Sequence, residues 1–178
     1  MSLSKIILRL FGWKVQCTVP DYPKCIICVA PHTSNWDFVL GKLAYWSLGR
    51  QAGFLIKETW FFFPMNLIFK ALGGIPVPRR RGSSLTDVLI DKFNASTRMS
   101  LAITPEGTRA RVSEWRTGFL RIAYGAKVPI VLAAIDAAKK QIYLDRTYQP
   151  TGDIETDMAA IKDYYKDMTG IKPENFTI

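Results

Sequence analysis

Histidine, cysteine and long apolar runs are all scarce in this chain. Its 178 residues include one histidine and three cysteines. An odd cysteine count argues against a disulfide framework and favours a reducing compartment. No apolar run reaches the ~20 residues that a membrane-spanning helix needs. None precedes the small-residue cleavage site of a signal peptide. We therefore expect neither a spanning segment nor a leader.

Nucleotide-binding and hydrolase motifs are absent too. The sequence has no Gly-x-x-x-x-Gly-Lys loop, no Gly-x-Gly-x-x-Gly turn and no Gly-x-Ser-x-Gly elbow. Cys25 and Cys28 have the spacing of a zinc knuckle, with His32 nearby, but they lie in an apolar run typical of a buried strand. Residues three apart on a strand point to opposite faces, and a closed zinc site needs four ligands. We predict core cysteines and no metal site.

Positive charge is what the chain has in excess. Lys+Arg number 24 and Asp+Glu 15, so the net charge is +9. Residues 1–146 carry 21 basic and 9 acidic side chains, a net +12, whereas residues 147–178 carry 3 and 6, a net −3. This surplus favours an anionic partner, which could be a phosphate-bearing substrate, nucleic acid or an anionic membrane. The composition, 48% hydrophobic and 22% charged, excludes a disordered chain.

Strand-like and helix-like segments alternate along the chain. Buried or β-branched runs predict strands at residues 24–30, 53–56, 75–77, 99–103, 129–135 and 141–144. Helical spacing predicts helices at residues 37–48, 58–72, 83–96, 117–124 and 153–168, with a break at Pro64 and a stop at Gly125. This alternation predicts an α/β fold: a single domain, residues 1–178, with a largely parallel mixed sheet and helices on both faces.

Two apolar segments have two interpretations each. Residues 1–14 predict a short amphipathic helix with apolar side chains on one side and basic ones around it. Such a helix either packs on the domain or lies in the plane of a membrane surface. Residues 60–63 are four consecutive aromatics, which cannot all face the core of a helical segment. They are either core side chains or an exposed patch that contacts a bilayer.

Three loops that follow predicted strands contain the unusual side chains. In parallel sheets ligands bind beyond the carboxyl ends of the strands, which selects residues 31–37, 73–81 and 104–111. In the first loop His32 follows a buried strand, and Asp37 comes five residues later. If His32 lies outside the next helix and Asp37 in its first turn, the carboxylate reaches one ring nitrogen. The other nitrogen is then free to accept a proton, so the pair predicts a general base.

The other two loops are suited to anions. Residues 79–81 are consecutive arginines, whose guanidinium groups match phosphate oxygens in pairs, although a solvated basic turn is an alternative. In the third loop Gly107 permits a close backbone approach. Thr108 and Arg109 can donate to an anion there, and Glu106 can hold an arginine in place.

Together these loops resemble a known family. Residues 32–37, HTSNWD, look like the His-x4-Asp signature of the glycerolipid acyltransferases of the 1-acylglycerol-3-phosphate acyltransferase type. Residues 74–79, GIPVPR, 105–109, PEGTR, and 128–131, VPIV, are similar to that family's second, third and fourth blocks. The blocks come in the family's order and cover roughly residues 25–135.

The resemblance implies a reaction and a set of site residues. The reaction is acyl transfer from acyl-CoA or acyl carrier protein to the hydroxyl of a lysophospholipid acceptor, in phospholipid biosynthesis. The acceptor that the resemblance favours is 1-acylglycerol-3-phosphate. His32 is then the base and Asp37 its orienting partner. The residues implied for the acceptor phosphate are Arg79, Glu106, Gly107, Thr108 and Arg109. No metal and no cofactor beyond the acyl donor is expected, because a thiolate leaves readily and the acceptor hydroxyl attacks directly.

The expected location follows from the acceptor, and two other functions stay open. Because the acceptor lipid resides in a membrane, we expect a cytoplasmic protein, peripheral on the inner face of the membrane, with no nucleic-acid partner. Departures from the family blocks, such as Pro78 before Arg79, concern the acceptor. One alternative is therefore a same-family enzyme with a non-glycerophosphate acceptor such as a lyso-ornithine lipid. The other is a non-catalytic basic module that binds anionic lipid or nucleic acid.

Overall fold

The apolar run at residues 24–30 forms a central strand of the sheet. A computed structural model of the protein describes residues 2–77 and 84–178. It places β2 (Lys24–Ala30) between β6 (Ile130–Asp136) and β5 (Met99–Ile103), both parallel to it. Every side chain of β6 is buried, as expected for a parallel strand that is covered on both faces.

The described residues form one sheet of seven strands, in the order β1-β7-β6-β2-β5-β3-β4. Beyond β5 lie β3 (Gly53–Lys57) and β4 (Gly74–Val77), which continue the parallel direction. Beyond β6, β7 (Gln141–Tyr148) is antiparallel, and β1 (Lys14–Cys17) pairs parallel with β7. The predicted α/β class with a largely parallel mixed sheet is confirmed.

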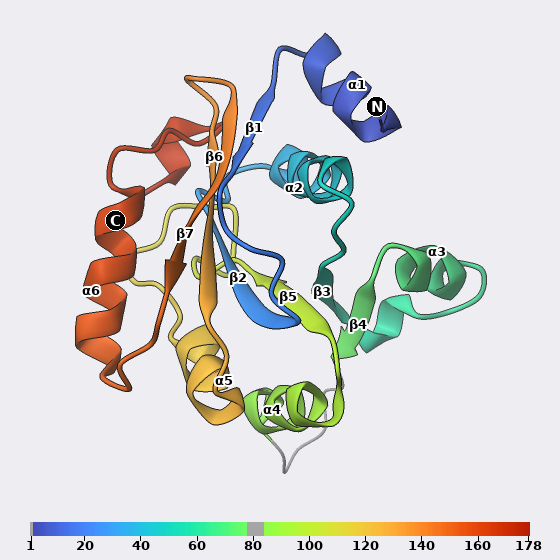
Figure 1. The fold of residues 1–178 in the computed structure, drawn as a ribbon, viewed down its shortest axis with the longest axis vertical. Coiled ribbons are helices and arrows are strands. Elements are labelled where there is room, and N and C mark those ends of the chain that lie inside the picture. The colour runs from blue at the N-terminus through green and yellow to red at the C-terminus, as the bar shows by residue number, and fades with distance from the viewer. Residues whose placement is uncertain (1, 78–83) are drawn as a thin grey trace.

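Helices cover both faces of this sheet (Figure 1). On one face lie α4 (Leu85–Ala95), α5 (Gly118–Ala126) and α6 (Ile154–Tyr165), whose buried side chains form one core with the strands. On the other face lie α1 (Leu3–Leu10) and α2 (Asn35–Ser47), which form a second core. The sheet thus separates two hydrophobic cores, as in other layered α/β folds.

The two cysteines of β2 illustrate this separation. Cys25 belongs to the core under α1 and α2, and Cys28 to the core under α4, α5 and α6. They point to opposite faces, as their spacing predicts. Burial raises the pKa of the Cys28 thiol to about 12, so the thiol stays protonated near neutral pH.

The predicted helix at residues 58–72 is two short pieces. The 3₁₀ turn η1 (Glu58–Trp60) and the helix α3 (Met65–Ala71) are separated near Pro64, and α3 lies beyond the edge strand β4 (Figure 1). Neither piece contains a buried residue. A second 3₁₀ turn, η2 (Pro173–Asn175), lies near the C-terminus.

One predicted helix end is wrong, and one strand was not predicted. Gly125 does not end α5, which runs to Ala126 and stops at Lys127, a residue with φ of 52°. A Cβ on Gly125 would lie 2.4 Å from Cδ1 of Ile90, so this glycine lets α5 approach α4 closely. Strand β1 was not predicted, because its exposed and half-buried side chains give little pattern and its partner β7 lies far along the chain.

Candidate active site

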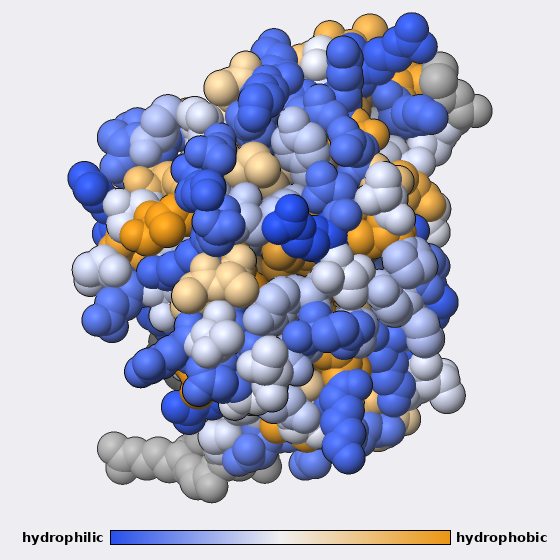
Figure 2. Space-filling model, turned by 60° about the vertical axis from the view of Figure 1, so that its left-hand side comes forward, coloured by the Kyte–Doolittle hydropathy of each residue, from blue (hydrophilic) through white to orange (hydrophobic). Residues whose placement is uncertain are grey.

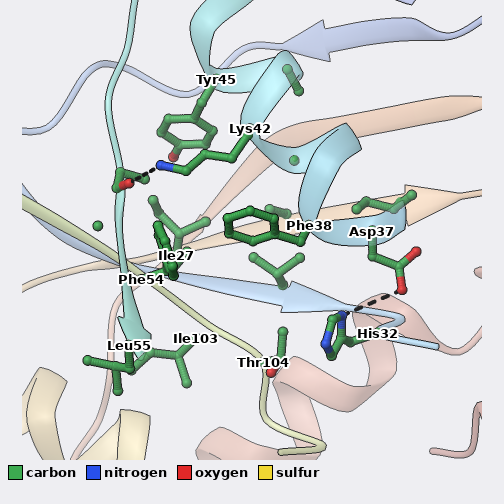
Figure 3. A pocket seen from close by; sticks show the side chains of 18 of the residues that line it. Ile27, His32, Asp37, Phe38, Lys42, Tyr45, Phe54, Leu55, Ile103 and Thr104 are labelled. Carbon is green, nitrogen blue, oxygen red and sulfur yellow. Dashed lines mark hydrogen bonds and ion pairs between the residues drawn. The ribbon is translucent and has the colours of Figure 1, made fainter. Parts of the chain in front are cut away.

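His32 and Asp37 lie together at the carboxyl end of β2. His32 is outside any helix, and Asp37 is in the first turn of α2. Nδ1 of His32 is 3.5 Å from Oδ2 of Asp37 (Figure 3). The imidazole is 18% exposed and the carboxylate 1%. The structure therefore has the arrangement that the five-residue spacing predicts.

Backbone amides hold the Asp37 carboxylate in place. Its Oδ2 accepts hydrogen bonds from the N–H groups of Thr33 at 2.6 Å and Ser34 at 2.7 Å. Ser34 is the N-cap of α2, and its hydroxyl accepts from the N–H of Trp36 at 3.2 Å. The helix start is a capping box in which Asp37 is the acidic member. Oδ1 of Asp37 is buried and has no hydrogen-bond partner among the described residues.

Glu106 supports the loop that contains His32. Its oxygens accept from the backbone N–H of His32 at 2.8 and 3.2 Å, and its side chain is buried. Burial raises the pKa of Glu106 to about 8, while the hydrogen bond from His32 lowers it and the Asp37 carboxylate raises it further. The sequence predicts that Glu106 holds an arginine. In the structure its carboxylate holds the main chain of His32 and so joins the third loop to the first.

Arg109 joins the same two loops at the surface. Its guanidinium donates to Oδ1 of Asn35, the first residue of α2. Thr108 and Arg109 are exposed, and the Thr108 hydroxyl accepts from the N–H of Ala110 at 3.3 Å. Gly107 has φ of 66°, in the left-handed region that favours glycine. The third loop thus presents a threonine and an arginine next to the start of α2.

Arg116 is a candidate site residue that the sequence does not reveal. Its N–H donates to the carbonyl of Pro105 at 2.7 Å. Its side chain crosses Gly107 so closely that a Cβ there would lie 2.5 Å from Nε. The exposed Arg116 lines the mouth of a cavity together with His32. It lies in an irregular segment, so no periodic pattern marks it. Arg79, which the resemblance implies for phosphate binding, lies outside the described residues.

A cavity of about 460 Å³ runs from His32 between α2 and the sheet (Figure 3). Its mouth is polar and includes the side chains of His32, Asp37, Thr104 and Arg116. Deeper in, strands β2, β3, β5, β6 and β7 line it with apolar side chains: Ile27, Val29, Phe54, Leu55, Ala102, Ile103, Ala133, Ile135, Ile142 and Leu144. An apolar cavity with a few polar groups at one end is typical of a ligand site.

Small side chains in α2 leave room for this cavity. Phe38, Gly41, Ala44 and Tyr45 line it at helical spacing, and two of these four, Gly41 and Ala44, are small. Protein cores normally contain few voids larger than a water molecule, so glycine and alanine at these positions leave a space that larger side chains would fill. The signal in the sequence is the pair of small residues on one stripe of a helix. The depth of the space depends on the strands opposite.

The chemistry that this arrangement allows is proton transfer beside a bound apolar chain. Asp37 contacts only one ring nitrogen of His32, and the other nitrogen faces the pocket in Figure 3. A neutral imidazole so placed can accept a proton from a hydroxyl at the cavity mouth, and the carboxylate stabilises the imidazolium that forms. The buried thiol of Cys28 offers no competing nucleophile, since its raised pKa keeps it protonated.

Comparison with known proteins gives a family match and similar curated proteins. Residues 15–136 match the model of a family described as Acyltransferase. The chain is 25% identical over 148 residues to the 1-acyl-sn-glycerol-3-phosphate acyltransferase of Escherichia coli K12, covering 78% of this chain and 59% of that protein. It is 29% identical over 174 residues to a probable 1-acyl-sn-glycerol-3-phosphate acyltransferase of Mycoplasma pneumoniae, covering 83% and 62%. The chain thus spans about three fifths of the length of these relatives.

A solved structure has a similar fold. The 1-acyl-sn-glycerophosphate (LPA) acyltransferase PlsC from Thermotoga maritima superposes with a TM-score of 0.63, covering 92% of this chain and 76% of that chain. The sequence identity is 19%, so this likeness concerns the fold. The matched segment 15–136 contains both the loop with His32 and Asp37 and the loop from Glu106 to Arg109.

Proposed function

Because this chain belongs to the acyltransferase family, we propose that it transfers a fatty acyl group from an acyl thioester to the hydroxyl of a lysophospholipid. The donor is acyl-CoA or acyl carrier protein, and the acceptor is 1-acylglycerol-3-phosphate. The observation that carries this proposal is the His32–Asp37 pair at the mouth of an apolar cavity. The polar mouth suits the reacting groups, and the interior suits a fatty acyl chain. The two relatives, a known and a probable 1-acyl-sn-glycerol-3-phosphate acyltransferase, support the acceptor class.

In the proposed mechanism His32 is the general base. The imidazole takes the proton of the acceptor hydroxyl while the hydroxyl oxygen attacks the thioester carbonyl carbon. The carbon–sulfur bond then breaks, and the leaving thiolate takes the proton back from the imidazolium. Asp37, 3.5 Å from Nδ1, selects the ring tautomer and stabilises the imidazolium. Glu106 acts through the backbone of His32 and is a positioning residue.

We assign the acceptor phosphate to the arginines at the rim of the site. Arg116 crosses Gly107 at the cavity mouth, and Arg109 lies beside Asn35 at the start of α2. Guanidinium groups bind phosphate oxygens in pairs, and the hydroxyl of Thr108 adds a further donor. The expectation that Arg79 also binds the phosphate stays a prediction.

We also propose that the protein works from the cytoplasmic surface of a membrane. No helix in the described part of the chain has the length and apolar character to cross a membrane. Helix α1 buries Ser4 and Leu8, while Leu3 is 73% and Leu10 79% exposed. Part of the apolar surface of α1 is therefore directed outward, which favours the interfacial interpretation of residues 1–14.

The test is a thiol-release assay with acyl-CoA and acyl carrier protein donors and a panel of lysolipids. The panel includes lysophosphatidic acid, a lyso-ornithine lipid and an uncharged lysolipid. Wild-type protein should release thiol fastest with lysophosphatidic acid. His32→Ala should lower the rate by ~10²-fold or more, because a general base is lost, while circular dichroism shows an intact fold. Wild-type turnover in a folded His32→Ala protein would contradict the assignment of His32 as the general base.

The phosphate assignment has its own variants. Arg109→Ala and Arg116→Ala should each weaken acceptor use by ~10–100-fold and leave donor use unchanged, since a charge-assisted contact is lost. Lysine at either position should not restore activity fully. Arg121→Ala on α5 removes the same charge at an exposed position and serves as the control. The assignment is wrong if the two variants prefer phosphate-bearing over uncharged acceptors as strongly as wild type does.

A further inference from the structure

Residues 169–178 pack against the loop that contains His32. The hydroxyl of Thr33, the next residue in that loop, accepts a hydrogen bond from the backbone N–H of Lys172 at 3.1 Å. Thr33 is 1% exposed, and Gly170 is buried beside it. A Cβ on Gly170 would lie 2.7 Å from both Oγ1 and Cγ2 of Thr33. The segment and the loop are therefore in direct contact, with no room for an added methyl group.

Both ends of this segment are fixed to the rest of the domain. At one end, the carbonyl oxygen of Thr169 accepts from the N–H of Ala137, the residue after β6, at 2.7 Å. At the other end, the indole N–H of Trp115 donates to the carbonyl of Thr177 at 3.1 Å. The ring of the buried Trp115 also lies 6.3 Å from that of Phe176, centroid to centroid. The middle of the segment, which contacts the loop, is therefore held from both ends.

We propose that Thr33 and Gly170 are positioning residues, through which residues 169–178 hold the Asp37 carboxylate beside the imidazole of His32. This inference rests on the proposed function, in which that imidazole is the general base. Thr33 makes the connection, because its hydroxyl accepts from the segment while its backbone N–H donates to Oδ2 of Asp37 at 2.6 Å. The same Oδ2 lies 3.5 Å from Nδ1 of His32. A displacement of Thr33 therefore reaches the carboxylate and, through it, the imidazole.

Small changes at Thr33 suffice to test this connection. Thr33→Val keeps the shape of the side chain but removes the hydroxyl, so the N–H of Lys172 loses its acceptor and meets a methyl group. Thr33→Ser keeps the hydroxyl and serves as the rescue variant. Gly170→Ala pushes on Thr33 from the other side of the contact. It tests the proposal even if Thr33→Val does not fold.

The first measurement is spectroscopic and needs no turnover. His32 is the only histidine in the chain, so NMR signals of a histidine-labelled protein belong to it alone. The nitrogen chemical shifts of the ring report which nitrogen carries the proton, and Asp37 beside Nδ1 favours a proton on Nδ1. Thr33→Val and Gly170→Ala should move these shifts towards a mixture of the two tautomers. Thr33→Ser should keep the wild-type values.

The second measurement separates kcat from KM in the acyl-transfer assay. We expect Thr33→Val and Gly170→Ala each to lower kcat by about tenfold, because a misplaced base costs rate, and to leave KM for donor and acceptor unchanged. Thr33→Ser should restore most of kcat. A residue that served only the stability of the fold would change neither the ring signals nor kcat of the folded protein.

Matched controls lie away from the loop. The Thr147 hydroxyl on β7 accepts from the hydroxyl of Tyr22 at 3.2 Å, so Thr147→Val removes a comparable hydrogen bond. A Cβ on Gly118 of α5 would meet nothing within 4 Å, so Gly118→Ala adds the same methyl group without a clash. Both variants should show wild-type ring signals and wild-type kcat, with circular dichroism as the folding check.

Two results would overturn the proposal: wild-type ring signals in folded Thr33→Val and Gly170→Ala, or the same change of the signals in the two controls. A different result bears on the reaction alone. If the ring signals change as expected but the wild type transfers no acyl group to any lysolipid, the proposed function is contradicted. The positioning of Asp37 and His32 by residues 169–178 is then still supported.

Discussion

Asp37 serves the helix α2 and the proposed base, His32, at once. Its Oδ2 accepts from the backbone N–H groups of Thr33 and Ser34, and the same oxygen lies 3.5 Å from Nδ1 of His32. Because the capping hydrogen bonds fix the carboxylate, the group that orients the imidazole is itself held by the start of α2. Glu106 fixes the backbone of His32 from the other side. His32, which lies in an irregular loop, is thus held from two sides.

Asp37→Asn should therefore separate binding from chemistry. The amide oxygen can still accept the capping hydrogen bonds, so we expect an unchanged fold and an unchanged KM for donor and acceptor. It cannot stabilise the imidazolium, so kcat should fall by ~10²-fold or more. Steady-state kinetics with circular dichroism as the folding control decide this. An unchanged kcat with a raised KM would show that Asp37 is not the orienting partner.

Glu106 makes stability depend on pH. Its pKa is raised by burial from the ordinary value of 4.5 to about 8 in the folded protein. Between these values the folded state binds the extra proton, so its stabilising effect is complete below about pH 4.5 and is lost as the pH rises through 8. Glu106→Gln cannot ionise, and its free energy of unfolding should fall less between about pH 5 and 8.5 than that of wild type. Urea unfolding at both pH values measures this, and equal pH dependence would contradict the raised pKa.

Helix α6 is anchored by one buried carboxylate, that of Asp157. Asp157 in its first turn accepts from the hydroxyls of Tyr124 at 2.6 Å, Tyr148 at 2.8 Å and Thr151 at 2.6 Å. Burial raises the pKa of Asp157, but the hydrogen bonds outweigh burial and lower it to about 2. Farther along α6, the Tyr165 hydroxyl donates to a backbone carbonyl of β2 at 2.7 Å. Helix α6 thereby supports the strand that leads into the loop with His32.

Asp157→Ala should lower the free energy of unfolding by about 3 kcal/mol, because it leaves buried hydroxyl donors without their charged acceptor. The stabilisation is present above the ordinary aspartate pKa of 3.8 and is lost as the pH falls towards 2. Asp163→Ala on the same helix is the control, since Asp163 pairs with Lys166 at 2.8 Å between exposed side chains. It should cost no more than about 0.5 kcal/mol. Similar losses in both variants by chemical denaturation would contradict this account of α6.

Exposed apolar side chains are unevenly distributed over the whole molecule. The face in Figure 2, on the side of α6, is mainly hydrophilic, with apolar side chains in small separate patches. The most exposed large apolar side chains belong instead to α1, the start of α2, and η1 with α3: Leu3, Leu10, Phe11, Trp36, Trp60, Phe62, Phe63, Leu67 and Ile68. Trp36 is the neighbour of Asp37, so a membrane that contacts Trp36 would lie close to the His32–Asp37 pair. The net +12 of residues 1–146 favours anionic lipid.

Vesicle binding should follow this asymmetry. We expect reversible cosedimentation with vesicles that strengthens with anionic lipid content and weakens with salt, because surface electrostatics are screened. Leu10→Asp and Phe63→Asp should each weaken binding by about 10–100-fold, since both side chains are 79% exposed and would be buried in the interface. Ile178→Asp, which alters another exposed apolar side chain, should change it little. Failure to bind any vesicle would remove the membrane proposal.

Local pattern was enough to predict most of the fold. The strands at residues 24–30 and 99–103 have the bounds that the sequence predicts. Each is a short apolar run between polar turns, so the change in polarity marks where the strand begins and ends. The pairing of His32 with Asp37 was also predictable from local pattern. A strand end and a helix start only five residues apart allow few relative positions of the two side chains. Glycines were less informative: Gly125 permits helix packing and does not end a helix.

The sequence by itself thus determined the α/β class, the order of most elements, the family resemblance and the histidine–aspartate pair, all of which depend on residues near one another in the chain. The tertiary structure alone decided what Glu106 contacts, that Arg116 crosses Gly107, and that a cavity runs from His32 to Lys42. Each of these depends on groups that lie far apart in sequence and meet only when the helices pack on the sheet. A cavity in particular is a space between side chains, and no single segment of the chain encodes it.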